Sequence, residues 1–419
     1  SKLKKYLKMK KIYKILKIIF DAKFIWSKPK HSDILIYDSN MVEFISPYIT
    51  KYKSDIIHTR LEKIYLYILM KLLIKFSLKN LLLNYTKIFI ELSKPKIIIT
   101  ATDNDINFYK LKMEVKSVKF KTIAIQNGHR TIDAPDILNY YKDFNESKLA
   151  SDYILCFFSE LGKEYEKIIQ CKSITIGSFL NNINFEYKKY NQEKSIKNFF
   201  WISQYRYRPL DSNIFDENSL TENQKNNFIN KTVGEHMSLE KKILPIMYKF
   251  CKEKNIKFNI LSSYKKTKKK EILIAEKNFY KNIINDPDWE MNENKKKNRT
   301  DVYKILLEEA DIVAHNDSTL GYESLARGIK TISITEKKSF YLDIVPKFSW
   351  PSKFDYKGPI WTNSDDENEI LRLLNFIYSV NNDDWNNYIH TVKDKIMQTD
   401  SDNKIFSNLI EKLIKNDKI

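Results

Sequence analysis

Several polar side chains that could do chemistry follow apolar runs of the chain directly. The apolar residues 312–314 end at the loop 315–319, which precedes a short helical segment closed by Gly328 and a second apolar run, 330–334. Such a unit directs backbone N–H groups and the positive end of a helix dipole towards a phosphate or a ribose. A Ser or Thr in this loop is suited to cap the helix. The residues predicted to bind a nucleotide donor here are His315, Asn316, Asp317, Ser318, Thr319 and Glu323.

Two carboxylates follow the apolar run 97–99. Asp103 and Asp105 could act there as a general base, as a nucleophile, or as hydrogen-bond acceptors for a sugar hydroxyl. The alternative is that one of them caps the helix that begins near Ile106. Because the strand ends of open α/β sheets face the ligand, we predict that Asp103 and Asp105 are catalytic and that Asn104 binds the acceptor.

A third polar segment, residues 126–131, follows the apolar run 122–125. His129 titrates near neutral pH and could take a proton from an acceptor hydroxyl; the alternative is a loop histidine bonded to the backbone. We predict that His129 is catalytic. Its neighbours Gln126, Asn127 and Arg130 are predicted to bind the acceptor.

Two further strand ends carry candidates for the donor phosphates. Arg206 and Arg208 follow the strand expected at 199–203, and the planar guanidinium matches phosphate geometry. The alternative is that both arginines lie in an ordinary surface loop. The residues of these two strand ends that we predict to bind the donor are Ser203, Gln204, Arg206, Arg208, Ser262 and Ser263.

The elements that must position these residues alternate between strand and helix. The chain of 419 residues, 42% of them hydrophobic, is long enough for two domains with full cores. Strands are expected at 33–37, 96–100, 122–126, 153–158, 173–176, 199–203, 258–261, 312–314, 330–334 and 359–361, and helices over 60–92 and 235–254. This alternation predicts an α/β fold with mainly parallel sheets.

The polar segment 181–197 fits an interdomain linker. We therefore predict two Rossmann-like domains, residues 1–185 and residues 186–419. The closing helices after residue 384 are candidates to cross back to the first domain.

The charge of the chain is strongly basic and uneven. The net charge is +19, and residues 1–30 hold eleven lysines against one acid, Asp21. Apolar residues interleave with lysines between 10 and 20, which suits an anionic membrane surface. The alternative is an ordinary surface helix of a lysine-rich protein. Nucleic acid is not expected as a partner, because no nucleic-acid-binding motif accompanies the charge.

The compartment predicted from the sequence is the cytoplasm, at the inner face of the membrane. Three cysteines form no CxxC pair and are expected to be free, buried thiols. No small-residue cleavage site follows the apolar stretch near the first residue, which argues against a secretory signal. The most hydrophobic region, 64–83, is interrupted by three lysines and is not expected to span a bilayer.

Three segments carry a resemblance to known families. Glu323 lies five residues before Gly328, with a strand following, which is similar to the donor-nucleotide segment of GT-B glycosyltransferases. His315 stands where many retaining members have a second Glu. The segments STLGYESLARG, TDNDINFYKL and IQNGHRT resemble bacterial surface-carbohydrate biosynthesis proteins of the capsule and O-antigen type. The resemblance implies two Rossmann-like domains facing a cleft, in which residues 1–185 would bind the acceptor and residues 186–419 would bind the donor. It also implies that Glu323 holds the ribose hydroxyls of a sugar nucleotide.

These observations together predict a glycosyltransferase that moves a hexosyl or acidic sugar from a nucleotide-sugar donor to a surface polysaccharide or a lipid-linked glycan. One alternative is a CDP-polyol phosphotransferase of the teichoic-acid type, because IQNGHRT loosely resembles the Gln–x–x–His–Gly motif of such enzymes. A second alternative is an inactive scaffold of a polysaccharide assembly complex, and a GT-B-fold epimerase is a weaker enzyme alternative. No cofactor is predicted. A divalent cation is not expected either, although residues 103–105 offer oxygen ligands for one.

Overall fold

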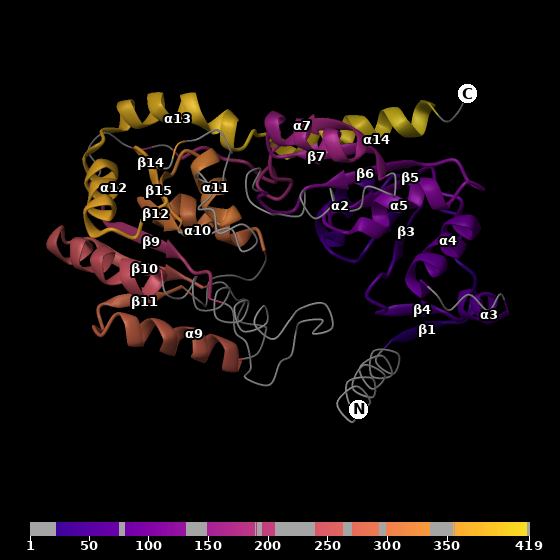
Figure 1. The fold of residues 1–419 in the computed structure, drawn as a ribbon, viewed down its shortest axis with the longest axis horizontal. Coiled ribbons are helices and arrows are strands. Elements are labelled where there is room, and N and C mark those ends of the chain that lie inside the picture. The colour runs from indigo at the N-terminus through magenta and orange to yellow at the C-terminus, as the bar shows by residue number, and fades with distance from the viewer. Residues whose placement is uncertain are drawn as a thin grey trace. The chain divides into compact units, whose positions relative to one another are not determined.

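The computed structural model describes residues 22–74, 80–130, 149–188, 190, 195–205, 239–262, 270–292, 299–335, 355 and 357–416. The chain divides into two compact units. Unit 1 comprises residues 1–127, 141–179 and 403–419, and unit 2 comprises residues 128–140 and 180–402. Figure 1 colours the chain from indigo to yellow, and each unit is described by itself below.

A six-stranded, fully parallel sheet forms the centre of unit 1. Its strands, in spatial order, are β3 (Ser54–Ile57), β2 (Ile34–Tyr37), β5 (Ile97–Thr100), β6 (Lys121–Ile125), β7 (Ala150–Cys156) and β8 (Gln170–Thr175). The central strands β2 and β5 are buried along their whole length, which explains their continuous apolar runs. The order of strands along the chain reverses between β2 and β5, which makes this the point of the sheet where ligands are expected.

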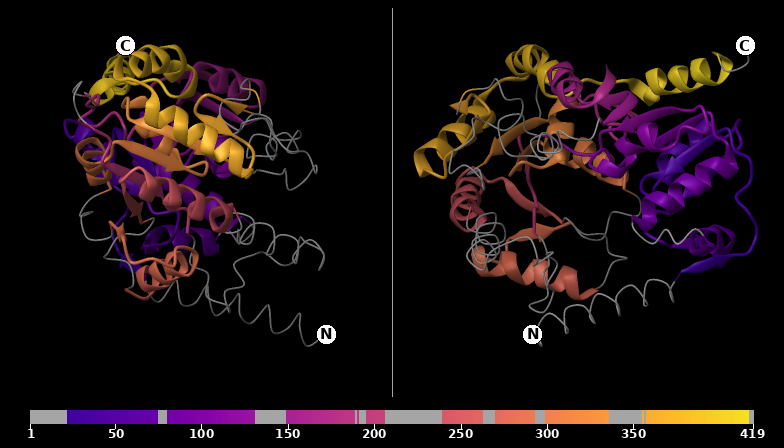
Figure 2. Two further views of the ribbon diagram at one scale, coloured as in Figure 1. Left: turned by 90° about the vertical axis from the view of Figure 1, so that its left-hand side faces the viewer. Right: turned by 45° about the vertical axis from the view of Figure 1, so that its right-hand side comes forward.

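Helices cover the unit 1 sheet, and two short strands, β1 (Lys23–Ile25) and β4 (Lys63–Tyr65), pair beside it. The helices are α2 (Val42–Ile49), α3 (Leu66–Ile74), α4 (Leu81–Ser93), α5 (Ile106–Glu114), α7 (Ser159–Ile168) and α14 (Lys404–Asn416). The prediction of one helix over 60–92 is therefore wrong in its first part, where β4 precedes α3. The last helix, α14, belongs to unit 1 and packs on α2 (Figures 1 and 2).

Unit 2 is built on a seven-stranded sheet in which one edge strand, β14, is antiparallel. Its strands, in spatial order, are β11 (Trp289–Met291), β10 (Lys257–Leu261), β9 (Asn198–Ile202), β12 (Ile312–His315), β13 (Lys330–Ile334), β15 (Trp361–Thr362) and β14 (Lys357–Gly358). The first five follow the Rossmann order 3-2-1-4-5 when numbered along the chain. Of the strand predicted at 359–361, only Trp361 is in a strand, as the first residue of β15, and residues 359 and 360 form the turn of the β14–β15 hairpin.

The helices of unit 2 begin with a segment that is helical over 239–253. The others are α9 (Lys270–Ile283), α10 (Asp301–Glu309), α11 (Thr319–Ala326), α12 (Glu367–Ser379) and α13 (Asn382–Ile396), followed by the 3-10 turn η1 (Ser401–Asn403), which spans the boundary with unit 1. Helix α12 packs on β13 and β15, and α11 packs on β13 and α13. The α/β class with two Rossmann-like units is thus confirmed.

The segment predicted to be a polar linker is largely attached to unit 2. Arg327, only 1% exposed, donates from Nε to Asn181 Oδ1 (2.7 Å) and from Nη2 to the carbonyl of Asn181 (2.6 Å). The Lys188 ammonium donates to the carbonyl of Ala310 (2.9 Å). Gly328, at φ +80°, ends α11 in the left-handed conformation that was predicted, and its carbonyl accepts from the Trp385 indole.

Among the described residues, no helix has both the length and the apolar character needed to cross a bilayer. All three cysteines are free. Cys156 and Cys251 are buried as predicted, whereas Cys171 is half-buried. Burial raises the pKa of the Cys156 and Cys251 thiols, which keeps both in the neutral form.

Candidate functional site

The strand order of unit 2 reverses between β9 and β12, and the polar residues 203–205 and 315–319 follow the carboxyl ends of these two strands. Because ligands of open α/β sheets bind where the strand order reverses, this edge of unit 2 is the principal candidate site. Most of the predicted donor-binding residues that the structure describes lie here.

The loop between β12 and α11 is held by its own polar groups. Asp317 adopts a left-handed conformation (φ +51°), and the backbone N–H of Ser318 donates to Nδ1 of His315 (3.0 Å). Of the two residues suited to cap the helix, Ser318 or Thr319, Ser318 occupies the N-cap position of α11, but its hydroxyl makes no capping hydrogen bond. The His315 ring holds the loop by accepting from the Ser318 N–H.

His315 is a neutral, structural member of this loop. Burial, with the nearby His129 adding to it, lowers the pKa of His315 to about 3. At neutral pH the ring therefore carries its one proton on Nε2, because Nδ1 accepts the hydrogen bond from Ser318. Space around the ring is tight: a Cβ placed on Gly321 would lie 2.1 Å from Cδ2 of His315. This contact explains why glycine stands in the first turn of α11.

His129 meets the same loop and forms its central interaction. Residues 128–140 belong to unit 2, and Nε2 of His129 lies 3.0 Å from Oδ2 of Asp317. The other carboxylate oxygen of Asp317 accepts from the Tyr322 hydroxyl (3.2 Å), and the backbone N–H of His129 donates to the Thr319 hydroxyl (3.1 Å). The structure thus joins the predicted catalytic histidine to two predicted donor-binding residues.

Glu323 has different partners from those expected for a ribose-binding residue. Its side chain is 5% exposed and accepts a hydrogen bond from the Tyr303 hydroxyl, whose pKa is raised by burial and by this carboxylate. The Tyr303 ring in turn stacks on the Arg327 guanidinium, 4.7 Å from its centroid. Glu323 therefore sits in a buried cluster beneath α11 that connects α10 to the segment after residue 180.

Ser203 and Ser262 also turn inward. Their hydroxyls donate to the two oxygens of Glu276, at 2.5 and 2.6 Å. This corrects the expectation that they contact donor phosphates, because both protons are taken by a fully buried carboxylate. Glu276 is a residue that sequence reasoning missed: it lies on a lysine-rich helix whose pattern gives no sign that one of its acids is buried.

A second buried carboxylate, Glu240, extends this network. The Tyr280 hydroxyl lies 2.7 Å from the Ser203 hydroxyl and 3.2 Å from Oε2 of Glu240, and the Trp201 indole donates to Oε1 of Glu240 (3.3 Å). Burial raises the pKa of Glu240 to about 7, although its hydrogen bonds with Gln204, Tyr280 and Trp201 act to lower it. A protonated Glu240 completes a chain of donors that runs through Tyr280 and Ser203 to Glu276. Gln204 joins it through its backbone N–H, 3.5 Å from Glu240.

In unit 1 the two predicted catalytic carboxylates have separate structural partners. Asp103 is fully buried and accepts from the Tyr165 hydroxyl (2.8 Å) and from the backbone N–H of Asn127 (3.2 Å). Asp105 is the N-cap of α5 and accepts from the backbone N–H of Asn107 (2.9 Å), which is the capping alternative considered above. Asp103 is thus placed to hold the loop together rather than to meet a substrate.

Sequence reasoning missed an acid at the reversal point of unit 1. Asp38 directly follows β2, has a positive φ of 83°, and lies 3.3 Å from the Arg60 guanidinium and 3.5 Å from the Thr102 hydroxyl. The Tyr37 hydroxyl donates to Asp105 (3.1 Å), and burial beside these acids raises its pKa. The signal was available, because Asp38 follows the predicted strand 33–37 as Asp103 follows the next one.

Most of the remaining predicted residues either bond the backbone of their own unit or lie outside the described residues. The Gln126 side chain accepts from the backbone N–H of Phe157 (2.9 Å), and the Asn127 amide donates to the carbonyl of Ala101 (2.8 Å). Arg130 donates to the carbonyl of His129, and Asn104 is exposed. Arg206, Arg208 and Ser263 lie outside the described residues. Within the described ranges, no group of three or more His, Cys, Asp or Glu side chains could hold a metal ion.

The fold and this site define a two-unit α/β protein with a polar ligand edge on a Rossmann-like sheet. A family profile described as "putative O-antigen biosynthesis protein" matches residues 123–414, more than two thirds of the chain. The chain therefore belongs to this O-antigen biosynthesis family, which confirms the resemblance to surface-carbohydrate biosynthesis proteins. No curated protein matches the chain in sequence.

Several solved structures are similar to this one at low identity. The wall teichoic acid polymerase TagF is 10% identical over 94% of this chain and 91% of its own, with a TM-score of 0.49. The UDP-GlcNAc 2-epimerase from Methanocaldococcus jannaschii is 12% identical over 91% and 99%, with a TM-score of 0.46. Sucrose-phosphate synthase from Thermosynechococcus elongatus is 9% identical over 87% and 83%, with a TM-score of 0.44.

Proposed function

We propose that this protein is a glycosyltransferase that moves a sugar from a nucleotide-sugar donor to a growing surface polysaccharide or a lipid-linked glycan. The observation that carries the proposal is the His129–Asp317 pair, with its 3.0 Å contact, at the reversal point of the unit 2 sheet. Membership of an O-antigen biosynthesis family supports the class of product.

The nucleotide of the donor would occupy the carboxyl edge of β9 and β12. The Ser318 hydroxyl leaves the N-terminus of α11 without a side-chain cap, so the N–H groups of the first helical turn suit a phosphate. The neutral His315 favours this arrangement, because it holds the loop by one hydrogen bond without adding a charge. Because Glu323 is bonded to buried partners, we propose that it supports α11 and does not bind the nucleotide.

His129 would act as the general base. Asp317 fixes the tautomer in which Nε2 carries the proton, so Nδ1 is the basic nitrogen of the neutral ring. As the acceptor hydroxyl oxygen forms its bond to the anomeric carbon, its proton passes to His129. The bond between that carbon and the donor phosphate oxygen breaks, and the nucleotide departs with the electron pair. Asp103 and Asp105 would support the neighbouring unit 1 loops.

An anionic membrane surface is the partner that we propose for unit 1. Four of its exposed large apolar side chains lie on β1, directly after it or on α3, namely Trp26 (84%), Ile74 (76%), Met70 (56%) and Phe24 (38%). Lysines lie beside them: the ammonium groups of Lys28 and Lys71 lie over the Tyr67 ring, 4.6 and 5.2 Å from its centroid. Exposed Trp with flanking lysines suits the headgroup region of a bilayer. Residues 1–21, which hold most of the lysine-rich segment predicted to bind the membrane, lie outside the described residues.

The first test is a thermal-shift screen of the purified protein against CMP, CDP, UDP, UMP, GDP and TDP. A nucleotide present at about 100 times its dissociation constant stabilises the folded protein by about 2.7 kcal/mol. Stabilisation by one nucleotide supports the donor site and identifies the donor class. If none of them stabilises the protein, the proposal fails and the scaffold alternative is preferred.

The released product separates the two kinds of transfer. A CDP-polyol donor would yield CMP together with transfer of a phosphoryl-polyol group, whereas a sugar nucleotide with a diphosphate would leave a nucleoside diphosphate. His129→Gln should abolish either transfer and leave nucleotide stabilisation within a factor of three in affinity. Loss of binding and transfer together would instead give His129 a structural role.

A further inference from the structure

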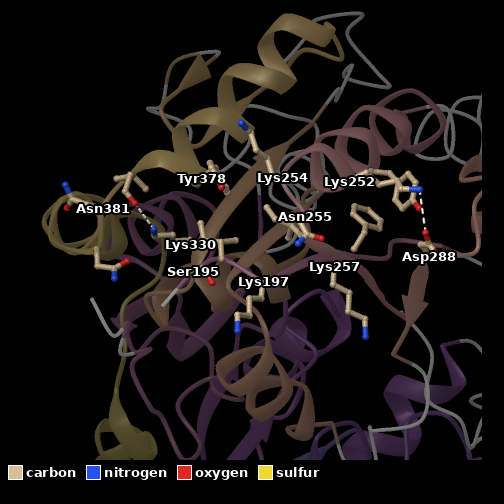
Figure 3. Close-up of a pocket in the computed structure, with 16 residues that line it drawn as sticks. Ser195, Lys197, Lys252, Lys254, Asn255, Lys257, Asp288, Lys330, Tyr378 and Asn381 are labelled. Atoms are coloured by element: carbon tan, nitrogen blue, oxygen red, sulfur yellow. Dashed lines mark hydrogen bonds and ion pairs between the residues drawn. The ribbon is translucent and has the colours of Figure 1, made fainter. Parts of the chain in front are cut away.

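A basic pocket of about 870 Å³ opens at the amino edge of the unit 2 sheet, where β9, β10 and β13 begin (Figure 3). The lysines that line it are Lys197, Lys252, Lys254, Lys257 and Lys330, and Asp288 is the one acid among the lining residues. Neither the family description nor the site described above assigns a role to this pocket.

The positive charge of the pocket is only partly neutralised. Lys252 pairs with Asp286 (2.7 Å) and Asp288 (3.5 Å), and Lys257 pairs with Glu290 (2.7 Å). A fourth acid, Asp311, acts on Lys330, so the five lysines exceed these four acids by one positive charge. Within the described part of the chain, Lys197 and Lys254 have no acidic partner, and Lys330 donates to the carbonyl of Val380 (2.6 Å).

The neutral groups of the pocket match a sugar chain. Tyr378, which is 36% exposed, presents an aromatic ring, and the ammonium of Lys254 lies 5.4 Å from its centroid. The Asn255 and Asn382 side chains can donate to hydroxyl groups and accept from them, whereas Asn381 is the N-cap of α13 and bonds Asp384. Pyranose rings stack on aromatic faces through their C–H groups, while lysines attract carboxylate or phosphate substituents.

The pocket is separate from the candidate donor site of the same unit. Lys257 begins β10 and Ser262 follows its carboxyl end, five residues on, which at about 3.3 Å per residue is about 16 Å. In β13, Lys330 likewise stands at the opposite end from the edge that carries the loop 315–319. A ligand in this pocket therefore does not occupy the reaction site.

We propose that this pocket is a non-catalytic binding site for an acidic oligosaccharide, a segment of a polysaccharide that carries carboxylate or phosphate groups. The inference rests on the proposed function for the identity of the chain as a glycan. A concave site with an exposed aromatic ring, lysines and amides fits a flexible sugar chain better than the plane of a bilayer. Such a site retains a growing polymer between successive transfers.

Isothermal titration calorimetry of the full chain tests the site. The probes are penta-galacturonic acid as the acidic oligosaccharide, maltopentaose as its neutral counterpart, and vesicles with 30 mol% phosphatidylglycerol. The pocket variant is Lys197→Glu with Lys254→Glu. The control is Lys277→Glu with Lys281→Glu, two exposed lysines of α9 outside the pocket that give the same change in charge.

The expected result is that penta-galacturonic acid binds at least ten-fold more tightly than maltopentaose. The pocket variant should lose at least ten-fold in that affinity, and the control less than three-fold. Equal losses in both variants, absence of binding to the unmodified protein, or a pocket variant that loses only vesicle binding would each overturn the proposal. Nucleotide stabilisation reports on the opposite edge of the sheet, so failure of this inference and failure of the proposed function are separately visible.

Discussion

Glu240→Gln should remove a pH dependence of stability that the buried network imposes on the protein. The Glu240 side chain is 1% exposed, and burial raises its pKa from 4.5 to about 7. Between pH 4.5 and about 7, Glu240 is therefore protonated in the folded state and ionised in the unfolded state. Stability from this group is fully present below pH 4.5 and is lost as the pH rises through about 7.

The magnitude follows from the two pKa values. A difference of about 2.5 pH units at about 1.4 kcal/mol per unit corresponds to about 3 kcal/mol, with no reduction for solvent screening because the group is buried. The amide that replaces the carboxyl group of Glu240 keeps the geometry: its N–H₂ donates to Tyr280, and its carbonyl accepts from Trp201. The variant should thus be similar in stability to the unmodified protein at acidic pH and more stable than it above pH 7.

The assay is urea unfolding, followed by tryptophan fluorescence, at half-unit steps from pH 4.5 to 8. The difference in free energy of unfolding between the variant and the unmodified protein should change by about 3 kcal/mol across this range. Glu276→Gln is the matched control, because its carboxylate accepts from two hydroxyls and an amide cannot. It should destabilise the protein throughout. Parallel pH curves for Glu240→Gln and the unmodified protein would refute the reasoning.

Three further outcomes are expected. Asp317→Asn should lower the transfer rate by about 100-fold or more, because the amide no longer holds His129 as a base; release of nucleotide measures it, and an unchanged rate would remove the pair from the mechanism. Gly321→Ala should cost about 1–3 kcal/mol of stability in urea unfolding, because its Cβ would displace the His315 ring; an unchanged midpoint would contradict that contact. Trp26→Ala should weaken co-sedimentation with anionic vesicles several-fold and leave stabilisation by nucleotide unaltered. If the variant and the unmodified protein co-sediment equally, the exposed apolar residues around Trp26 are not the surface that binds the membrane.

Most central strands could be predicted because both of their faces are buried. Runs such as residues 34–37 and 97–100 have no polar face to expose, and a continuous apolar run bounded by polar loops is typical of such strands. The edge strands β3 and β11 were missed because they are short and half-exposed. The strand β4 was absorbed into a predicted helix because three residues are too few to show a period of two.

The position of the candidate site could be predicted better than the direction of its side chains. Strand ends identified the loop 315–319, but its partner His129 lies 190 residues before Thr319. No spacing rule connects them, because the contact depends on the whole fold of unit 2. Ser203 and Ser262 were assigned to the ligand for their position alone, whereas one buried acid, Glu276 on α9, accepts from both hydroxyls and decides where they point.

Unit 1 cannot be completed until unit 2 has been synthesised, because its last helix, α14, follows unit 2 in the chain. The Phe406 ring packs edge-on against Phe179 and Tyr48, at 5.1 and 5.9 Å between centroids, and the Asn403 amide donates to the carbonyl of Phe179. More than 200 residues separate Phe179 from this helix, which at about 5–20 residues per second is on the order of tens of seconds on the ribosome. Throughout that interval the rings of Tyr48 and Phe179 lack the Phe406 ring that packs against them in the folded unit, so the sheet of unit 1 precedes part of its own core on the ribosome.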